Sequence, residues 1–153
     1  MSPSKVSRKV FLDRIAWVDR MLAEIRALPL ASRAAFTADA RNIWSAESCL
    51  RRALEALFDI GRHVLARGYG LGFSEYREIA VKLADCAVLS ADESALLKIL
   101  AGYRNRLVHF YHEASIDEWY KICARELRDL EAIKVALVRW WLTAHPETVD
   151  ETL

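Results

Sequence analysis

The chain has 153 residues, of which 54% are apolar and 28% are charged, and its formal net charge is +1. That length and composition are typical of one globular domain that buries its own core, and they exclude a disordered chain. A near-neutral charge gives no overall attraction to nucleic acid, so such a partner would have to be bound by a local basic patch.

The cysteines and the amino terminus bear on the compartment. Cys49, Cys86 and Cys123 are widely spaced and lie within apolar patterns, without a Cys-x-x-Cys pair. They indicate buried thiols in a reducing compartment and argue against a disulfide framework or a zinc knuckle. The polar amino terminus lacks the apolar core of a signal peptide, and no segment approaches the roughly 18 apolar residues of a membrane span. We therefore expect a soluble, cytoplasmic protein without a membrane partner.

A proline separates the first two predicted helices. Apolar residues recur at helical spacing over Val6–Leu28, and Pro29 ends this segment because proline cannot continue the backbone hydrogen bonds. A long helix is predicted over Arg33–Ala66, with Ser32 or Thr37 as its N-cap.

The long helix carries two apolar stripes, which indicates neighbours on two sides and hence a central position. The first stripe is Ile43, Leu50, Leu57 and Val64, and the second is Trp44, Phe58 and Leu65. Gly61 lowers the helix propensity by about 1 kcal/mol relative to alanine. A close approach of another helix at Gly61 would explain why glycine occupies this position.

The segment Arg67–Phe73 is the one clear loop. Its alternating glycines resemble a phosphate-cradling loop only faintly, because it follows a helix and lacks the lysine and hydroxyl residue of a P-loop. A C-cap glycine followed by a connection is the favoured interpretation.

Two capping boxes mark the later helices. A short helix over Ser74–Ala87 is followed by Ser90-Ala-Asp-Glu93, which opens a fourth helix. Ser115-Ile-Asp-Glu118 opens a final long helix that ends at His145-Pro146. The chain therefore predicts an all-α, single-domain, up-and-down bundle of about five helices without strands. The domain spans residues 1–145, and residues 146–153 form a short acidic tail that frays.

The fourth helix leads into a polar stretch, Ala101-Gly-Tyr-Arg-Asn-Arg-Leu-Val-His-Phe-Tyr-His-Glu113. Asn105 and His109, four residues apart, share a helix face, so the amide can orient the imidazole for acid–base chemistry. Arg104 lies about 140° from His109 around the helix. Arg104 and Arg106 are suited to binding a phosphate. Histidine and arginine together suffice for metal-free RNA cleavage, in which the 2′-OH attacks the adjacent phosphate.

Three alternatives compete for the same residues. Cations are common in the last turn of a helix, where the helix dipole favours them. His109, His112 and Glu113 offer metal ligands, although their order matches neither HExxH nor HxxEH. Tyr103 and Tyr111 would suit the edge of a core.

A family resemblance favours the catalytic interpretation. Arg104-Asn-Arg-Leu-Val-His109-Phe-Tyr111 resembles the Arg-x4-His-x-Tyr motif of HEPN-domain toxins, in the branch paired with minimal nucleotidyltransferase antitoxins. The helical segment 46–63 also resembles that branch. The resemblance covers most of the chain.

The resemblance implies a metal-independent endoribonuclease, without a cofactor, that acts as the toxin of a type VII-like toxin–antitoxin system. In that family two bundles form a homodimer whose Arg–His sets face each other across a cleft that binds RNA. Arg104 and His109 would be catalytic, with Asn105 in support. The partner nucleotidyltransferase would attach AMP to Tyr111, and the added phosphate and nucleoside would oppose RNA entry.

Four other residues lie outside the family's fixed pattern. Arg106 and His112 are predicted to contact RNA or to cap the helix, and His63 and His145 to be structural or solvated. Two other function classes remain open, namely a non-catalytic adaptor subunit that binds nucleotide or protein and a metal-dependent hydrolase.

Overall fold

The computed structural model describes residues 5–109, 116–144 and 149–150, and gives the backbone path alone for residues 108, 109, 149 and 150. Its elements, in chain order, are β1 (Val6–Ser7), α1 (Arg8–Arg26), α2 (Arg33–Thr37), α3 (Ala40–His63), the π-helix η1 (Val64–Gly68), α4 (Tyr76–Asp85), α5 (Ala91–His109), α6 (Ile116–Lys121), the π-helix η2 (Ile122–Glu126), α7 (Leu127–Thr143) and β2 (Val149–Asp150).

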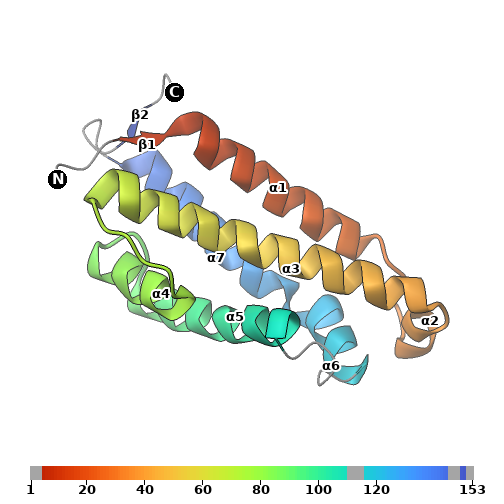
Figure 1. The fold of residues 1–153 in the computed structure, drawn as a ribbon. Coiled ribbons are helices and arrows are strands. Elements are labelled where there is room, and N and C mark those ends of the chain that lie inside the picture. The colour runs from red at the N-terminus through yellow and green to blue at the C-terminus, as the bar shows by residue number, and fades with distance from the viewer. Residues whose placement is uncertain (1–4, 110–115, 145–148, 151–153) are drawn as a thin grey trace.

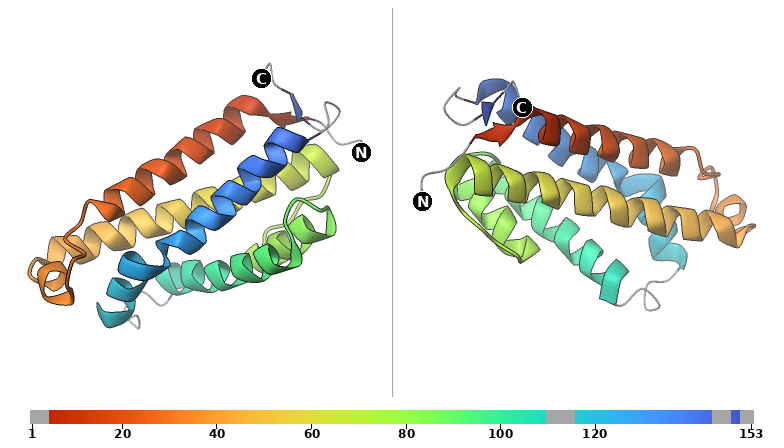
Figure 2. Two further views of the ribbon diagram at one scale, coloured as in Figure 1. Left: turned by 180° about the vertical axis from the view of Figure 1, so that it is seen from behind. Right: turned by 45° about the horizontal axis from the view of Figure 1, so that its top comes forward.

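The long helices form an up-and-down bundle with α3 at its centre. Helix α3 packs along α1 on one side and against α4 and α5 on the other (Figure 1). Seen from behind, α7 fills the space between α1 and α5 (Figure 2). Since η2 joins α6 to α7 without a break, the predicted final helix from residue 116 is one continuous helical segment. The predicted all-α bundle is confirmed.

The core follows the apolar stripes, with one departure. Leu50, Leu57 and Val64 of the first stripe are buried, as are Phe58 and Leu65 of the second. The pattern also predicts that Trp44 is buried in the core. This prediction is wrong, because Trp44 is 64% exposed. It lies near the amino end of α3.

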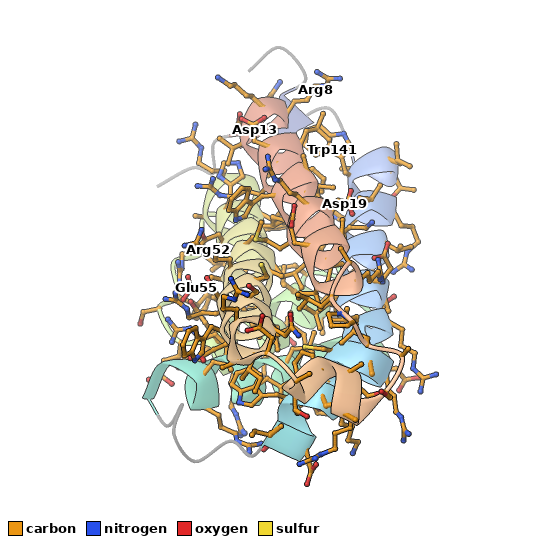
Figure 3. All side chains as sticks on the ribbon, turned by 90° about the vertical axis from the view of Figure 1, so that its right-hand side faces the viewer. Arg8, Asp13, Asp19, Arg52, Glu55 and Trp141 are labelled. Atoms are coloured by element: carbon orange, nitrogen blue, oxygen red, sulfur yellow. The ribbon has the colours of Figure 1, made fainter. Side chains whose placement is uncertain are left out.

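Polar contacts tie α1 to α7. Lys134 interrupts the apolar face of α7, and its ammonium lies 2.5 Å from Asp19 of α1 and 2.6 Å from Glu131. Figure 3 shows Asp19 on the side of α1 that faces α7. Nearer the termini, the ring of Trp141 stacks on Phe11 at a centroid distance of 4.8 Å. The ion pairs of Lys134 explain why a lysine occupies a position where the helical pattern predicts an apolar residue.

Capping residues set several helix boundaries. Ser32 Oγ accepts a hydrogen bond from the Ala35 amide and caps α2. Asp39 then caps α3 by accepting from the Arg41 amide at 2.9 Å. The single helix predicted over Arg33–Ala66 is therefore wrong at its amino end, because a turn at residues 38–39 divides it.

The capping box that opens α5 is confirmed. Ser90 Oγ accepts from the Glu93 amide at 3.1 Å, and the Ser90 amide donates to Glu93 Oε1 at 2.8 Å. Arg139 of α7 also binds Glu93, and this pairing lowers the pKa of the carboxyl group. The helix start is thus fastened to α7. The second predicted box begins at Ser115, which lies outside the described residues.

A small strand pair departs from the strand-free prediction. Val6 and Ser7 pair in parallel with Val149 and Asp150, so these two residues of the tail do not fray. Two-residue strands carry no periodic pattern that a sequence could reveal. The Ser7 amide also donates to His63 Nε2 at 3.0 Å. Burial and nearby arginines lower the pKa of His63, which favours the neutral ring that accepts this bond. The structural interpretation of His63 is confirmed.

Glycines act at two places in the bundle. Gly70 has a φ of 69°, which fits the predicted C-cap glycine after the long helix. A Cβ atom at Gly61 would lie 3.0 Å from Ile79 and 3.0 Å from Leu83, both in α4. The predicted close helix approach is therefore confirmed, and α4 is the helix that approaches.

This approach makes opposite predictions for two helical glycines. Gly61→Ala is expected to lower the free energy of unfolding by about 1 kcal/mol, because crowding outweighs the gain in helix propensity. Gly102→Ala is the matched control in α5, where an added Cβ meets no described atom within 4 Å. It should raise the free energy of unfolding by up to about 1 kcal/mol. Denaturant titration followed by circular dichroism measures both, and equal stabilisation would contradict the close approach.

Candidate functional site

Arg104 lies where three helices meet. Helix α5 packs against α3 and α4, and the arginine enters their junction with its side chain 22% exposed. Its Cζ lies 4.5 Å from the centroid of the Tyr76 ring of α4, and its Nη2 lies 3.8 Å from Glu55 Oε1 of α3. Figure 3 marks Glu55 on α3, one turn beyond Arg52. The guanidinium is thus held by a ring and a carboxylate from two other helices.

The ring beneath Arg104 is itself fixed. Tyr76 stacks on the fully buried Phe58, with centroids 4.3 Å apart and an interplanar angle of 4°. Arg62 lies near the same ring, with its Cζ 5.8 Å from the centroid, and pairs with Asp59 at 3.2 Å. A cation over an aromatic face gains about 0.5–2 kcal/mol, with the larger values in desolvated places. The stack therefore restricts where the Arg104 guanidinium can go.

One donor of Arg104 is left over in this arrangement. Its Nε is buried and has no hydrogen-bond partner among the described residues. An unsatisfied buried donor costs about 1–3 kcal/mol, and such groups in native proteins often mark functional positions. The site thus orients the Arg104 guanidinium but leaves its Nε donor without an acceptor among the described residues.

Helix α5 reaches His109, as the motif requires. Arg104 and His109 are therefore five positions apart on one continuous helix, or about 7.5 Å along its axis. Asn105 is exposed. The His109 side chain lies outside the description, so its expected contact with Asn105 stays a prediction. Tyr111, His112 and Glu113, and with them the AMP site and the alternative metal ligands, also lie outside the described residues.

The neighbouring residues of α5 face a different helix. The Tyr103 hydroxyl donates to Glu126 Oε2 at 2.7 Å, and burial together with this carboxylate raises the pKa of Tyr103 to about 12. Arg106 pairs with Glu118 of α6. A tyrosine that holds its proton so firmly is suited to tying α5 to η2 and not to acting as a base. This agrees with the predicted place of Tyr103 at the edge of the core.

Beside the junction, α3 and α5 border an open groove of about 350 Å³. Trp44, Glu47, Ser48 and Arg51 line it from α3, and Leu107 lines it from α5. The groove lies at the end of α5 that carries His109, because α3 and α5 run antiparallel (Figure 1). The described part of the polar stretch therefore reaches a groove at Leu107.

Sequence patterns missed Glu55 and Tyr76. Both belong to helices predicted correctly in kind, but no local motif connects them to Arg104. One signal was present. Polar residues at Ser48, Arg51 and Glu55 recur along one side of α3, which is unusual for a helix apolar on two sides. Such a side can border a groove instead of the core.

No helix within the described ranges is long and apolar enough to cross a membrane.

Solved structures resemble the chain over most of its length. A toxin–antitoxin complex with AMP-PNP contains a chain 26% identical to this one, with a TM-score of 0.73, covering 84% of this chain and 97% of the other. The tri-AMPylated HEPN toxin of Shewanella oneidensis, solved in complex with an MNT antitoxin, is 24% identical with a TM-score of 0.75, covering 85% and 97%. YutE of Bacillus subtilis, a cytosolic protein of unknown function, is 20% identical with a TM-score of 0.73, covering 94% and 95%. The last two likenesses bear on the fold alone.

The sequence comparisons decide the family. No curated protein matches the chain. The family model described as ribonuclease HepT-like matches residues 18–137, which include Glu55, Tyr76, Arg104 and His109. This match and the likeness to toxin–antitoxin structures confirm the resemblance to HEPN toxins of the kind paired with MNT antitoxins. The chain belongs to the ribonuclease HepT-like family.

Proposed function

We propose that this protein is a metal-independent endoribonuclease that acts in the cytoplasm as the toxin of a type VII-like toxin–antitoxin pair. The observation that carries the proposal is the placement of Arg104. Its guanidinium is held over Tyr76 and beside Glu55, five residues before the histidine of the same helix. Its Nε is buried and has no hydrogen-bond partner among the described residues.

The proposed reaction uses one base and one fixed cation. His109 accepts the proton of a ribose 2′-OH, and the 2′-oxygen attacks the adjacent phosphorus. The bond from phosphorus to the 5′-oxygen breaks, and the imidazolium returns a proton to that leaving oxygen. Arg104 stabilises the negative charge that gathers on the phosphoryl oxygens. A guanidinium already oriented by neighbouring helices needs little reorganisation as the charge develops.

A homodimer would complete the site. Arg104 turns toward α3 and α4, whereas His109 lies about 140° away around an ideal helix. A two-fold axis beside the end of α5 would bring the histidine of one copy toward the arginine of the other. It would also double a modest positive patch, which compensates for the net charge of +1 when RNA binds.

Control by an antitoxin would act on Tyr111. This residue follows His109 by two positions, so a phosphate attached there would place negative charge and a bulky nucleoside at the end of α5. One related structure supports control by a nucleotide-using partner, since it contains a toxin–antitoxin complex with AMP-PNP. A partner nucleotidyltransferase would thereby block RNA entry.

Substitutions at the proposed catalytic pair should slow cleavage strongly without unfolding the protein. His109→Ala is expected to slow cleavage of single-stranded RNA by about 10²–10⁴-fold, the usual contribution of acid–base catalysis. Arg104→Ala should slow it by about 10²–10³-fold, as loss of a group that stabilises transition-state charge does. Cleavage of a labelled RNA by the full chain measures both.

Arg20→Ala, at an exposed position on α1, is the matched control and should cleave as fast as the parent. Activity that persists in a chelator is the expected result for a metal-independent reaction, and loss in chelator would favour the metal-dependent hydrolase. Unchanged cleavage by His109→Ala would contradict the catalytic assignment and favour a binding-only adaptor.

AMP transfer gives a separate readout. After coexpression with the partner nucleotidyltransferase, mass spectrometry is expected to find AMP on the peptide that contains Tyr111, and the modified protein should no longer cleave RNA. Tyr111→Phe should keep cleaving RNA after the same coexpression, because phenylalanine cannot accept the nucleotide. An unmodified Tyr111 peptide in a neutralised complex would show that neutralisation follows another route.

A further inference from the structure

The groove between α3 and α5 is lined by side chains that could bind a ligand. It has one broad exposed aromatic face, Trp44, on a helix whose other large apolar residues are mostly buried. Glu47 and Arg51 stand beside it, and neither forms an ion pair with any described residue. The groove thus brings together an exposed aromatic ring, a carboxylate and a guanidinium.

The groove also lies at a useful distance from the proposed chemistry. Glu55 is level with Arg104, and the two helices run antiparallel, so residues earlier in α3 lie alongside and beyond the end of α5 (Figure 1). Trp44 precedes Glu55 by about 16 Å along α3, while His109 follows Arg104 by about 7.5 Å along α5. The indole thus lies roughly 8 Å past the end of α5 along the bundle axis. That places it near a nucleotide flanking the cleaved phosphate.

We propose that this groove is the base-binding subsite of the ribonuclease, an inference that rests on the proposed function. Trp44 stacks on one unpaired base of a single-stranded RNA next to the cleavage position. Arg51, almost two turns away and therefore on the same side of α3, binds a backbone phosphate. Glu47 accepts hydrogen bonds from the edge of the stacked base, which favours guanine.

The chemistry of the lining argues for RNA as the occupant. Aromatic stacking with a nearby arginine is how proteins commonly bind single-stranded nucleic acid, since each base has a π-face and each nucleotide a phosphate. Guanine presents N1–H and N2–H side by side, and one carboxylate can accept both. Glutamate and serine are depleted at contacts between proteins, yet Glu47 and Ser48 both line this groove.

Binding and cleavage are tested separately. Full-length protein with His109→Ala keeps the RNA intact while fluorescence anisotropy gives Kd at one fixed salt concentration. In that background Trp44→Ala should weaken binding by about tenfold, and Trp44→Phe by no more than about threefold, because phenylalanine keeps a stacking face. Trp17→Ala is the matched control, as Trp17 is 38% exposed on α1 and away from the groove. It should leave Kd unchanged.

An abasic scan locates the contact. At one nucleotide beside the cleavage position, removal of the base should raise Kd about as much as Trp44→Ala does. Combining this abasic RNA with Trp44→Ala should raise Kd no further than either change alone, because both remove the same contact. At this nucleotide guanine should be preferred over uracil. Glu47→Gln should reduce that preference by about tenfold, since the amide has one acceptor oxygen and its NH₂ group would face one of the two guanine donors.

The outcomes separate this proposal from the proposed function. If the parent protein cleaves RNA but Trp44→Ala binds and cleaves RNA as the parent does, the subsite is wrong and the ribonuclease assignment stands. A change of oligomeric state on Trp44→Ala in analytical ultracentrifugation would overturn the subsite and assign the groove to a contact between proteins. If RNA does not bind to the His109→Ala protein at all, both proposals fail.

Discussion

The Arg104 guanidinium over the Tyr76 ring is the contact on which the site depends, and it requires three helices in register. Tyr76 stacks on the buried Phe58 because α4 lies close to α3, and α4 lies close because Gly61 has no side chain to hold it away. Glu55 then supplies the carboxylate on the third side. The close packing of α4 on α3 therefore determines how the Arg104 guanidinium is oriented.

The rest of the bundle stabilises the helix that carries this arginine. The start of α5 is capped by Ser90 and Glu93 and fastened to α7 through Arg139, and its later part is tied to η2 through Tyr103. The end of α5 opens on the Trp44 groove. The proposed chemistry and its control by AMP therefore gather at one end of a helix that is fixed along the rest of its length.

Local features were predictable from the sequence and tertiary ones were not. The capping box at Ser90 and the role of Gly61 follow from short-range rules, and both are confirmed. The break at Asp39 was missed because an apolar pattern can continue across a turn. Trp44 was placed in the core because periodicity finds the side of a helix without showing whether a neighbour reaches that turn. Glu55 and Tyr76 meet Arg104 only through folding, so no motif contained them.

The central claim is that the Tyr76 ring positions Arg104 for catalysis, and the RNA cleavage rate of a Tyr76 series tests it most directly. Tyr76→Phe keeps the ring and should retain the parent rate, whereas Tyr76→Leu should lower kcat by about tenfold or more because the guanidinium loses its platform. In an Arg104→Ala background the same two substitutions should be equivalent. Equal rates for Tyr76→Phe and Tyr76→Leu in the otherwise unchanged protein, with both variants folded by thermal melting, would contradict the account.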